Sequence, residues 1–104
     1  TMRSFKISCK IKFPNDIITA ERKKIAGILI EKKGKFFNIG IGINVDNEIR
    51  DTELRISMSQ VLGKLPGDKE RILERFIKHF HANKKGFLEK QDLYLKKWSD
   101  NLIK

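Results

Sequence analysis

The sequence predicts an α+β fold, in which a small and mostly antiparallel sheet is followed by helices. Three observations support this prediction. Residues 5–13 alternate strictly between apolar and polar side chains, as a half-buried strand does. Residues 36–45 place an apolar row on one side of a second strand. Residues 69–83 repeat apolar positions at helical spacing. We therefore expect one partial domain over residues 1–104, with a sheet in 1–45 and a helical part in 55–104.

The first strand is expected to end at Pro14, because proline cannot donate a ladder hydrogen bond and the Asn-Asp pair after it favours a turn. A short extended piece at residues 16–19 and a longer run at 24–31 then form a hairpin around a charged tip. A turn over residues 32–35 leads into the strand at 36–45. Links this short join antiparallel neighbours, so the sheet is predicted to be antiparallel.

The strand at residues 36–45 has two unlike faces, because successive side chains point to opposite sides. One face is expected to be buried in the core and carries Phe37, Ile39, Ile41, Ile43 and Val45. The other carries Phe36, Asn38, Gly40, Gly42 and Asn44. Glycine inside a strand often marks the close approach of a ligand or of another backbone. A bulge or tight helix–sheet packing is the alternative, and this stretch alone does not decide between them.

The second half of the chain is predicted to be helical after a polar surface loop at residues 46–54. Ser57 and Gln60 have the spacing of a capping box, which predicts a short helix ending near Gly63. The turn at residues 66–68 is expected to start a helix over 69–83 that can continue to residue 88. Its apolar face carries Ile72, Leu73, Phe76, Ile77 and Phe80. Asp92 is the expected cap of a final helix, in which Leu95, Trp98 and Leu102 share a face.

Composition narrows the class of partner. The 104 residues carry 23 basic and 13 acidic side chains, for a net charge of +10. This field attracts polyanions or an acidic protein. The lysines are spread along the chain and no nucleic-acid-binding signature is present, so we favour an acidic protein or nucleotide partner over sequence-specific nucleic-acid binding. Cys9 is the single cysteine, which fits a reducing cytoplasm. No signal peptide is visible, and the longest apolar run, residues 25–30, is too short to span a membrane.

The usual catalytic and metal-binding patterns are absent from the sequence. His79 and His81 lie two apart on a predicted helix and point in different directions, so they cannot share a metal. One cysteine cannot supply a zinc set, and no metal site is predicted. Ser57 and Ser59 fit a helix start better than a nucleophile. No phosphate-binding loop of the G-x-x-x-x-G-K-[ST] type is present.

Sheet geometry instead gathers a polar group beside the glycines. Asn15 and Asp16 end one strand region, Lys24 starts the next and Gly27 lies inside it. A lysine, an acid and an amide beside a bare glycine face suit a carboxylate or phosphate ligand, because the lysine neutralises charge and the amide fixes orientation. The acid can hold a ribose hydroxyl or a metal. The alternative is an exposed Lys24–Asp16 ion pair at the base of a hairpin, and spacing alone leaves both open.

Three segments together resemble the catalytic domain of biotin protein ligases. They are Lys-Phe-Pro-Asn-Asp-Ile at 12–17, Lys-Ile-Ala-Gly-Ile-Leu at 24–29 and Gly-Ile-Gly-Ile-Asn-Val at 40–45. Lipoate ligases share elements of the first two segments, whereas the Gly-Ile-Asn-Val ending is more similar to the biotin branch. The resemblance extends to residues 87–98 and covers nearly all of the chain. It implies the C-terminal half of an α+β catalytic domain related to class II aminoacyl-tRNA synthetases.

The resemblance also implies a two-step reaction. Biotin and ATP, with Mg2+ accompanying the nucleotide, give biotinyl-adenylate and pyrophosphate, and the biotinyl group then passes to a lysine of biotin carboxyl carrier protein. Lys24 matches the family lysine that contacts the carboxylate being activated. The other implied binding positions are Asn15 and Asp16 beside the ribose and phosphate, Gly27 and Leu29 against biotin, and Gly40, Gly42 and Asn44 along the adenylate.

Two departures from the family pattern limit this expectation. Phe13 replaces a common tryptophan, which is a conservative change. More seriously, the sequence has no Gly-Arg-rich loop of the G-R-G-x-x-G-R kind, which in the family folds over biotin and the phosphates, and no C-terminal β-barrel. The first hypothesis is therefore a partial ligase that is inactive alone and completed by a companion chain or a missing segment. The second is a non-catalytic accessory or ligand-binding remnant of the fold, and the third is a basic nucleic-acid-binding module.

A sheet that forms only part of a larger domain is also expected to expose an apolar edge or face. Such an edge pairs readily with another chain. The sequence therefore predicts self-association through the sheet.

Overall fold

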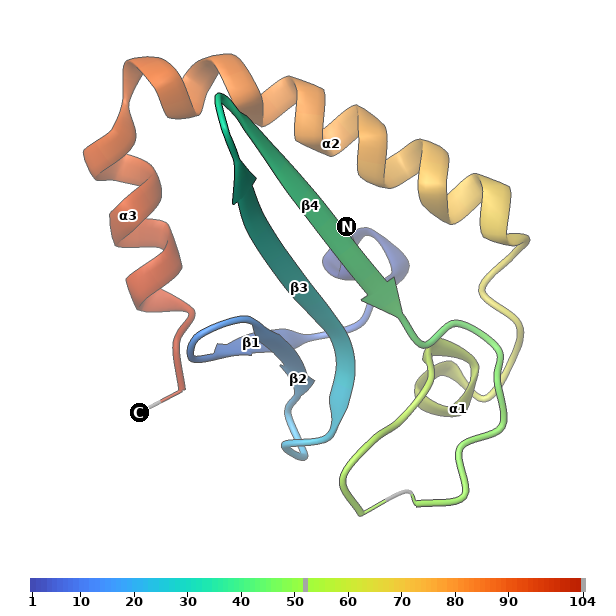
Figure 1. The fold of residues 1–104 in the computed structure, drawn as a ribbon. Helices are drawn as coiled ribbons and strands as arrows, with labels where there is room; N and C mark the ends of the chain where they lie inside the picture. Colours follow the sequence, from blue (N-terminus) through green and yellow to red (C-terminus); the bar gives the residue numbers. More distant parts are fainter. Residues whose placement is uncertain (52, 104) are drawn as a thin grey trace.

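The computed structural model describes residues 1–51 and 53–103, without the side chains of Phe87 and Leu88. It confirms the α+β fold, with a four-stranded sheet followed by helices (Figure 1). In chain order the elements are the 3-10 helix η1 (Met2–Phe5), strands β1 (Cys9–Lys12), β2 (Asp16–Thr19), β3 (Lys24–Lys33) and β4 (Phe36–Ile43), and helices α1 (Met58–Leu62), α2 (Lys69–Glu89) and α3 (Gln91–Asp100). No helix among the described residues is long and apolar enough to cross a membrane.

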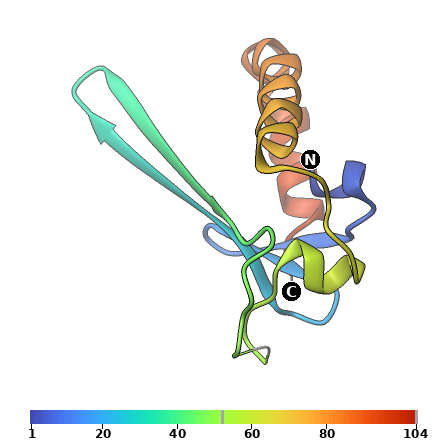
Figure 2. The same cartoon turned by 90° about the vertical axis from the view of Figure 1, so that its right-hand side faces the viewer.

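The sheet is an antiparallel meander, as predicted, with its strands in the order β1-β2-β3-β4. The strands β3 and β4 are longer than their neighbours, because every residue from Ala26 to Lys33 has a partner in β4. They form a ribbon that extends away from the rest of the molecule (Figure 2). Only the base of this ribbon lies next to β2, so its outer half is covered by no other strand of the sheet.

The predicted strand over residues 5–13 is wrong in its first half. Residues Met2–Phe5 form a 3-10 helix, and Lys6 ends it in the left-handed conformation with φ 63°. Ile7 follows directly and is 1% exposed, with its N–H donated to the carbonyl of Met2. An alternating pattern cannot separate this arrangement from a strand, because Ile7 is buried in either case. The strand itself begins at Cys9.

The core lies where the base of the sheet meets α1 and the start of α2. Its buried apolar residues are Ile7, Ile25, Ala26, Val45, Met58 and Ile72. The chain reaches α1 through the loop after β4, and the capping box predicted for this helix is present. The Ser57 hydroxyl accepts from the N–H of Gln60, whose side chain accepts from the N–H of Ser57.

Replacing Met58 with alanine is expected to lower the free energy of unfolding by about 2–5 kcal/mol, because Met58 is 0% exposed and its loss opens a cavity in the core. Chemical denaturation followed by circular dichroism measures the change. Val61→Ala in the same helix is the control, since Val61 is 39% exposed and has less contact to lose. Equal destabilisation by the two substitutions would show that Met58 does not anchor the core.

The long helix α2 agrees with prediction at both ends, whereas the start of α3 does not. Asp68 caps α2 by accepting from the N–H of Arg71, and the helix continues past residue 83 to Glu89, one residue beyond the predicted continuation. Only Lys90 then separates α2 from α3. Asp92 therefore lies in the first turn of α3, and its predicted role as the cap is wrong because Lys90 occupies that position.

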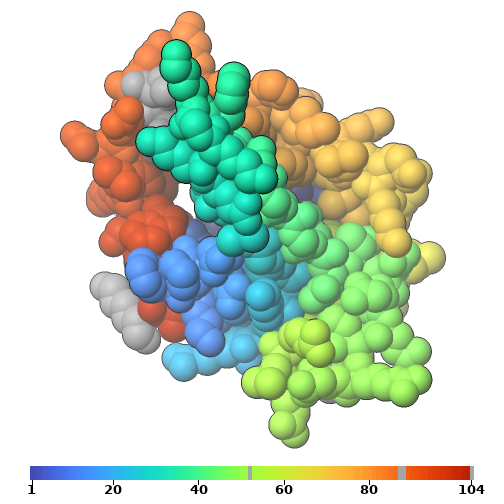
Figure 3. Space-filling view, in the orientation of Figure 1, coloured from blue at the N-terminus to red at the C-terminus, as the bar shows by residue number. Residues whose placement is uncertain are grey.

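The predicted burial of one whole face of β4 is wrong at its outer end. Phe37 is 63% and Ile39 is 48% exposed, although Val45 is buried at the base. The apolar face of α2 shows the same pattern, with Ile72 buried and Leu73, Ile77 and Phe80 exposed. Ile39, Ile41 and Ile43 face Leu73 and Phe76 across a groove of about 570 Å3. These two apolar surfaces are therefore separated by open space, and the end of the ribbon protrudes (Figure 3).

Candidate functional site

A single row of residues crosses all four strands on one side of the sheet. Lys12 pairs with Asp16, Asp16 pairs with Gly27, and Gly27 pairs with Gly42. Paired residues in an antiparallel ladder place their side chains on the same face. The row therefore brings a lysine and a carboxylate, from the first hairpin, next to two positions without side chains.

Leu29 and Gly40 form the next pair on the same side, farther along the ribbon. We call Gly27, Leu29, Gly40 and Gly42 the glycine face. A Cβ atom added at Gly42 would meet no described atom within 4 Å, and one added at Gly40 would meet only Leu29, at 3.7 Å or more. Leu29 itself is 57% exposed. The glycine face is thus open, with one apolar side chain at its outer end.

The ammonium of Lys24 lies over the inner end of the glycine face. Its Nζ is 3.0 Å from Asp16 Oδ1, and a Cβ added at Gly27 would lie 3.3 Å from the same Nζ. A register shift at Ile17 and Ile18 sets Lys24 opposite Ile18, on the side that Asp16 occupies. Both charged side chains remain partly accessible, at 44% for Lys24 and 29% for Asp16. The ion pair anticipated as the alternative is therefore present, and it lies beside the open glycines.

The two predicted asparagines lie at the margins of this group. Asn15 is exposed in the turn before β2, and its carbonyl accepts from the N–H of Ile28. Asn44 follows β4, and its side-chain amide donates to the carbonyl of Ile56 at 3.3 Å. Its main chain bonds to Ile25 and Met58. Asn44 thus fastens the loop before α1 to the sheet, and its predicted ligand contact remains a prediction.

Lys12 is the charged residue of this row that sequence reasoning did not single out. It lies on the polar side of the alternating N-terminal segment, and this alternation is the sequence feature that could have identified it. Its position opposite Asp16 depends on the register of the β1–β2 hairpin. With Lys24 it gives the row two cations against one carboxylate, which favours an anionic ligand.

The residues present do not form a metal cage. Among the described residues no group of three or more His, Cys, Asp or Glu side chains is placed to hold a metal ion. Asp16 supplies one carboxylate to the row, and that carboxylate pairs with Lys24. His79 is engaged elsewhere, with Nδ1 3.1 Å from the Thr1 hydroxyl. Any Mg2+ would therefore have to arrive with nucleotide phosphates as its principal ligands.

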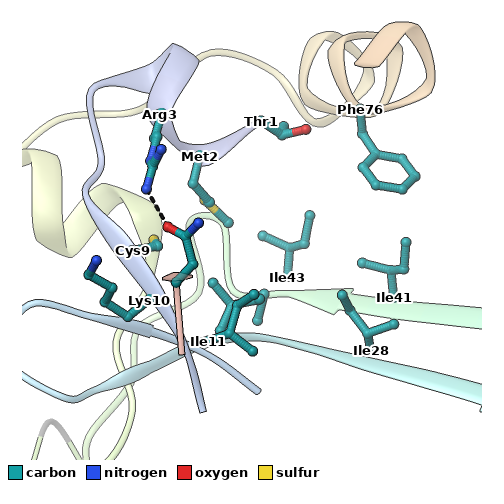
Figure 4. Close-up of a pocket in the computed structure, with 13 residues that line it drawn as sticks. Thr1, Met2, Arg3, Cys9, Lys10, Ile11, Ile28, Ile41, Ile43 and Phe76 are labelled. Atoms are coloured by element: carbon teal, nitrogen blue, oxygen red, sulfur yellow. Dashed lines mark hydrogen bonds between the residues drawn. The ribbon is translucent and has the colours of Figure 1, made fainter. Parts of the chain in front are cut away.

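The opposite side of the sheet holds an apolar cavity of about 360 Å3 (Figure 4). Ile28, Ile41 and Ile43 line it together with Phe76 of α2. These isoleucines alternate with the glycines along β3 and β4, so the cavity and the glycine face lie on opposite sides. Neither Lys24 nor Asp16 lines this cavity, so the charged pair is found only beside the glycine face among these two surfaces.

The thiol of Cys9 is half-buried at the edge of this cavity, and its burial raises the thiol pKa above the ordinary value. A raised pKa leaves less thiolate at pH 8, and the thiolate is the reactive form. We expect Cys9 to react with a disulfide reagent several times more slowly in the folded chain than in the urea-unfolded chain, with a smaller difference at higher pH. Equal rates at pH 8 would contradict this assignment.

In sequence and in structure the chain is similar to biotin protein ligases. The biotin–[acetyl-CoA-carboxylase] ligase of Mycobacterium tuberculosis is 32% identical over 72 residues, covering 69% of this chain and 27% of the relative. Biotin–protein ligase 2 of Arabidopsis thaliana is 35% identical over 101 residues, covering 86% of this chain and 30% of the relative. No protein-family model matches the sequence.

The solved structures include the apo biotin protein ligase of Aquifex aeolicus, with a TM-score of 0.85 and 27% identity over 98% of this chain and 48% of that one. The same ligase in complex with biotin and ATP gives a TM-score of 0.72 and 28% identity, over 86% and 39%. The chain thus spans less than half the length of each of these proteins. Sequence and structure together relate this chain to the biotin protein ligase family, and they do so over part of the length of its members.

Proposed function

We propose that this chain is the part of a biotin protein ligase that carries the activating lysine and the adenylate-binding surface. In the proposed reaction a biotin carboxylate oxygen attacks the α-phosphorus of ATP, and the bond to pyrophosphate breaks. The amine of a carrier-protein lysine then attacks the acyl carbon of biotinyl-adenylate, releasing AMP and a proton. The observation that carries the proposal is the Lys24 ammonium at the inner end of an open glycine face.

Each residue of the site has a physical role in this proposal. The ammonium of Lys24 offsets negative charge on the carboxylate and phosphate as they approach each other, and Asp16 holds it in place. Gly40 and Gly42 let the acyl-adenylate lie against the main chain, while Leu29 packs on the biotin ring. Asn15 and Asn44, at the margins, are the proposed contacts to the ribose and the adenylate. Lys12 adds a second cation for the phosphates.

The proposal includes further polypeptide, either a companion chain or another segment, that supplies the rest of the catalytic domain. Two observations support it. The ligases that match are more than twice as long as the part this chain covers. Apolar side chains also remain exposed on the ribbon and on α2, on both sides of the open groove. We propose biotin carboxyl carrier protein as the acceptor, ATP with Mg2+ as the nucleotide, and a cytoplasmic location in keeping with the free Cys9.

The exposed end of the ribbon supports a further part of the proposal, which is self-association through the sheet. Ile30, Phe36 and Phe37 are each at least 60% exposed. Light scattering of the isolated chain should show a mass above that of the monomer as concentration rises. A clean monomer at high concentration would contradict self-association, but it would leave the ligase proposal intact.

The test of the ligase proposal is reconstitution. The chain is mixed with the part of the Aquifex aeolicus ligase that it does not cover, together with biotin, ATP, Mg2+ and biotin carboxyl carrier protein. Biotin should appear on the carrier in the full mixture and stay near background when either polypeptide is omitted. Binding of biotinyl-5′-AMP without turnover would favour the accessory hypothesis. Salt-sensitive DNA retention that survives Lys24→Ala, without labelling, would favour the nucleic-acid module.

A further inference from the structure

A further hollow, of about 470 Å3, lies where η1, the loop between α1 and α2, and the start of α2 meet. These elements gather on one side of the sheet (Figure 2). We call it the basic pocket, because four cationic residues line it. They are Lys6, Lys64, Arg71 and Arg75. None of its lining residues belongs to the glycine face or to the apolar cavity of Figure 4. It is therefore a separate feature of the molecule.

Within residues 1–51 and 53–103, no ion pair engages the cations of the basic pocket. No acidic residue lines the pocket, and none of its four cations makes an ion pair with a described Asp or Glu. Two lysines of α2 do have such partners, since Lys69 pairs with Asp46 and Lys85 with Glu89. Asp68 is close in sequence, but its carboxylate accepts from the N–H of Arg71 as the helix cap.

Two of the four cations have described neighbours in the fold, and Lys6 has an uncommon backbone conformation. The guanidinium of Arg75 lies 4.1 Å above the Phe5 ring and donates to the carbonyl of Ser4 at 3.1 Å. Arg71 folds back over Gly67, where an added Cβ would lie 3.5 Å from its Cδ. Lys6 has φ 63°, a conformation that glycine or asparagine would adopt more easily. This conformation ends η1 and turns the chain toward β1 at the edge of the pocket.

We propose that the basic pocket binds a small ligand that carries a chain of phosphate groups. Guanidinium groups bind phosphate through paired hydrogen bonds, and lysines add point charges to the same oxygens. Four cations without an ion pair among the described residues match a polyphosphate better than a single phosphate. The apolar lining, which includes Phe5 and Leu65, leaves room for an organic group. Inorganic polyphosphate and free nucleotides share this chemistry. The inference does not depend on the proposed ligase function.

Isothermal titration with tripolyphosphate at constant ionic strength tests the proposal. The chain should bind tripolyphosphate saturably at one site, and Lys64→Gln/Arg71→Gln should weaken binding at least about tenfold. The control is Lys32→Gln/Lys33→Gln, which removes the same charge from the exposed end of β3. Its affinity should stay close to that of the unaltered chain. Circular dichroism verifies that both variants fold, which is expected because Lys64 and Arg71 are exposed.

Equal weakening by the control pair would overturn the proposal, because it would show attraction by the diffuse net charge of the chain. Binding that does not saturate, or that is unaffected by the Lys64/Arg71 pair, would overturn it as well. Titration of ATP into the Lys24→Ala variant, whose glycine face is impaired, distinguishes free nucleotides from inorganic polyphosphate as the ligand of the basic pocket. Tighter binding of ATP than of tripolyphosphate assigns the pocket to nucleotides, and the reverse assigns it to inorganic polyphosphate. Retention of tripolyphosphate binding by Lys24→Ala would separate this pocket from the proposed ligase site.

Discussion

Replacing Lys24 with alanine is expected to lower biotinyl-adenylate formation by about 100- to 1,000-fold in the reconstituted mixture, because one preorganised charge facing the reacting groups is lost. The fold should persist. The Lys24–Asp16 pair is partly exposed, and such pairs contribute at most about 1 kcal/mol to the free energy of unfolding. Release of pyrophosphate from ATP in the presence of biotin measures the rate.

Lys23→Ala is the matched control for this substitution. Lys23 is the neighbouring residue and carries the same charge, but it pairs with Glu21 in the turn between β2 and β3, at 3.7 Å. Its removal should leave the rate of pyrophosphate release nearly unchanged. Equal losses in the two variants would mean that general charge, and not the placement of Lys24 over Gly27, determines the rate.

Replacing Gly42 with valine is expected to weaken biotinyl-5′-AMP binding by about 10- to 100-fold, because the new side chain fills the space above the glycine face. The same change should leave stability intact or raise it by up to about 1 kcal/mol, since glycine weakens a strand and valine favours it. The structure allows this, because a Cβ at Gly42 meets no described atom within 4 Å. Competition binding and chemical denaturation measure the two effects.

Asn38→Val provides the comparison, since it adds valine to the same strand at a position paired with Glu31, beyond the glycine face. It should alter ligand binding little. If Gly42→Val unfolds the chain, the glycine serves packing and not a ligand. Unchanged affinity in a folded Gly42→Val variant would show that the ligand does not lie there.

Local features of the fold were predictable from the sequence because each depends on neighbours in the chain. The hairpins follow from turn residues, the start of α1 from Ser57 and Gln60, and the start of α2 from Asp68. The failures at apolar positions of the predicted strands have a common cause. Ile7, Phe37 and Ile39 are all apolar at strand spacing. An apolar side chain favours burial, but its position in the sequence does not show which element, if any, covers it. In this chain the ribbon and α2 leave a groove between them.

The candidate site was predictable as a list of residues but not as an arrangement. Lys24, Asp16 and Gly27 are brought together by the register of β2 and β3, which includes a shift at Ile17 and Ile18 that no sequence pattern announced. Lys12 joins them through β1 for the same reason. Asn44, predicted to contact the adenylate, also fastens the loop before α1 to the sheet through its hydrogen bond to the Ile56 carbonyl. The spacing of motifs identified the family, whereas pairing between strands decided which side chains meet.

The most direct test of the central claim is amide NMR of the isotopically labelled chain in complex with the unlabelled remainder of the ligase, titrated with biotinyl-5′-AMP. Saturable shifts are expected at Gly27, Gly40 and Gly42, with little change at exposed positions of α2. A titration that does not saturate would contradict binding on the glycine face. Saturation with these glycine amides unmoved would contradict it equally, because the nucleotide-linked acyl group would then lie on another surface.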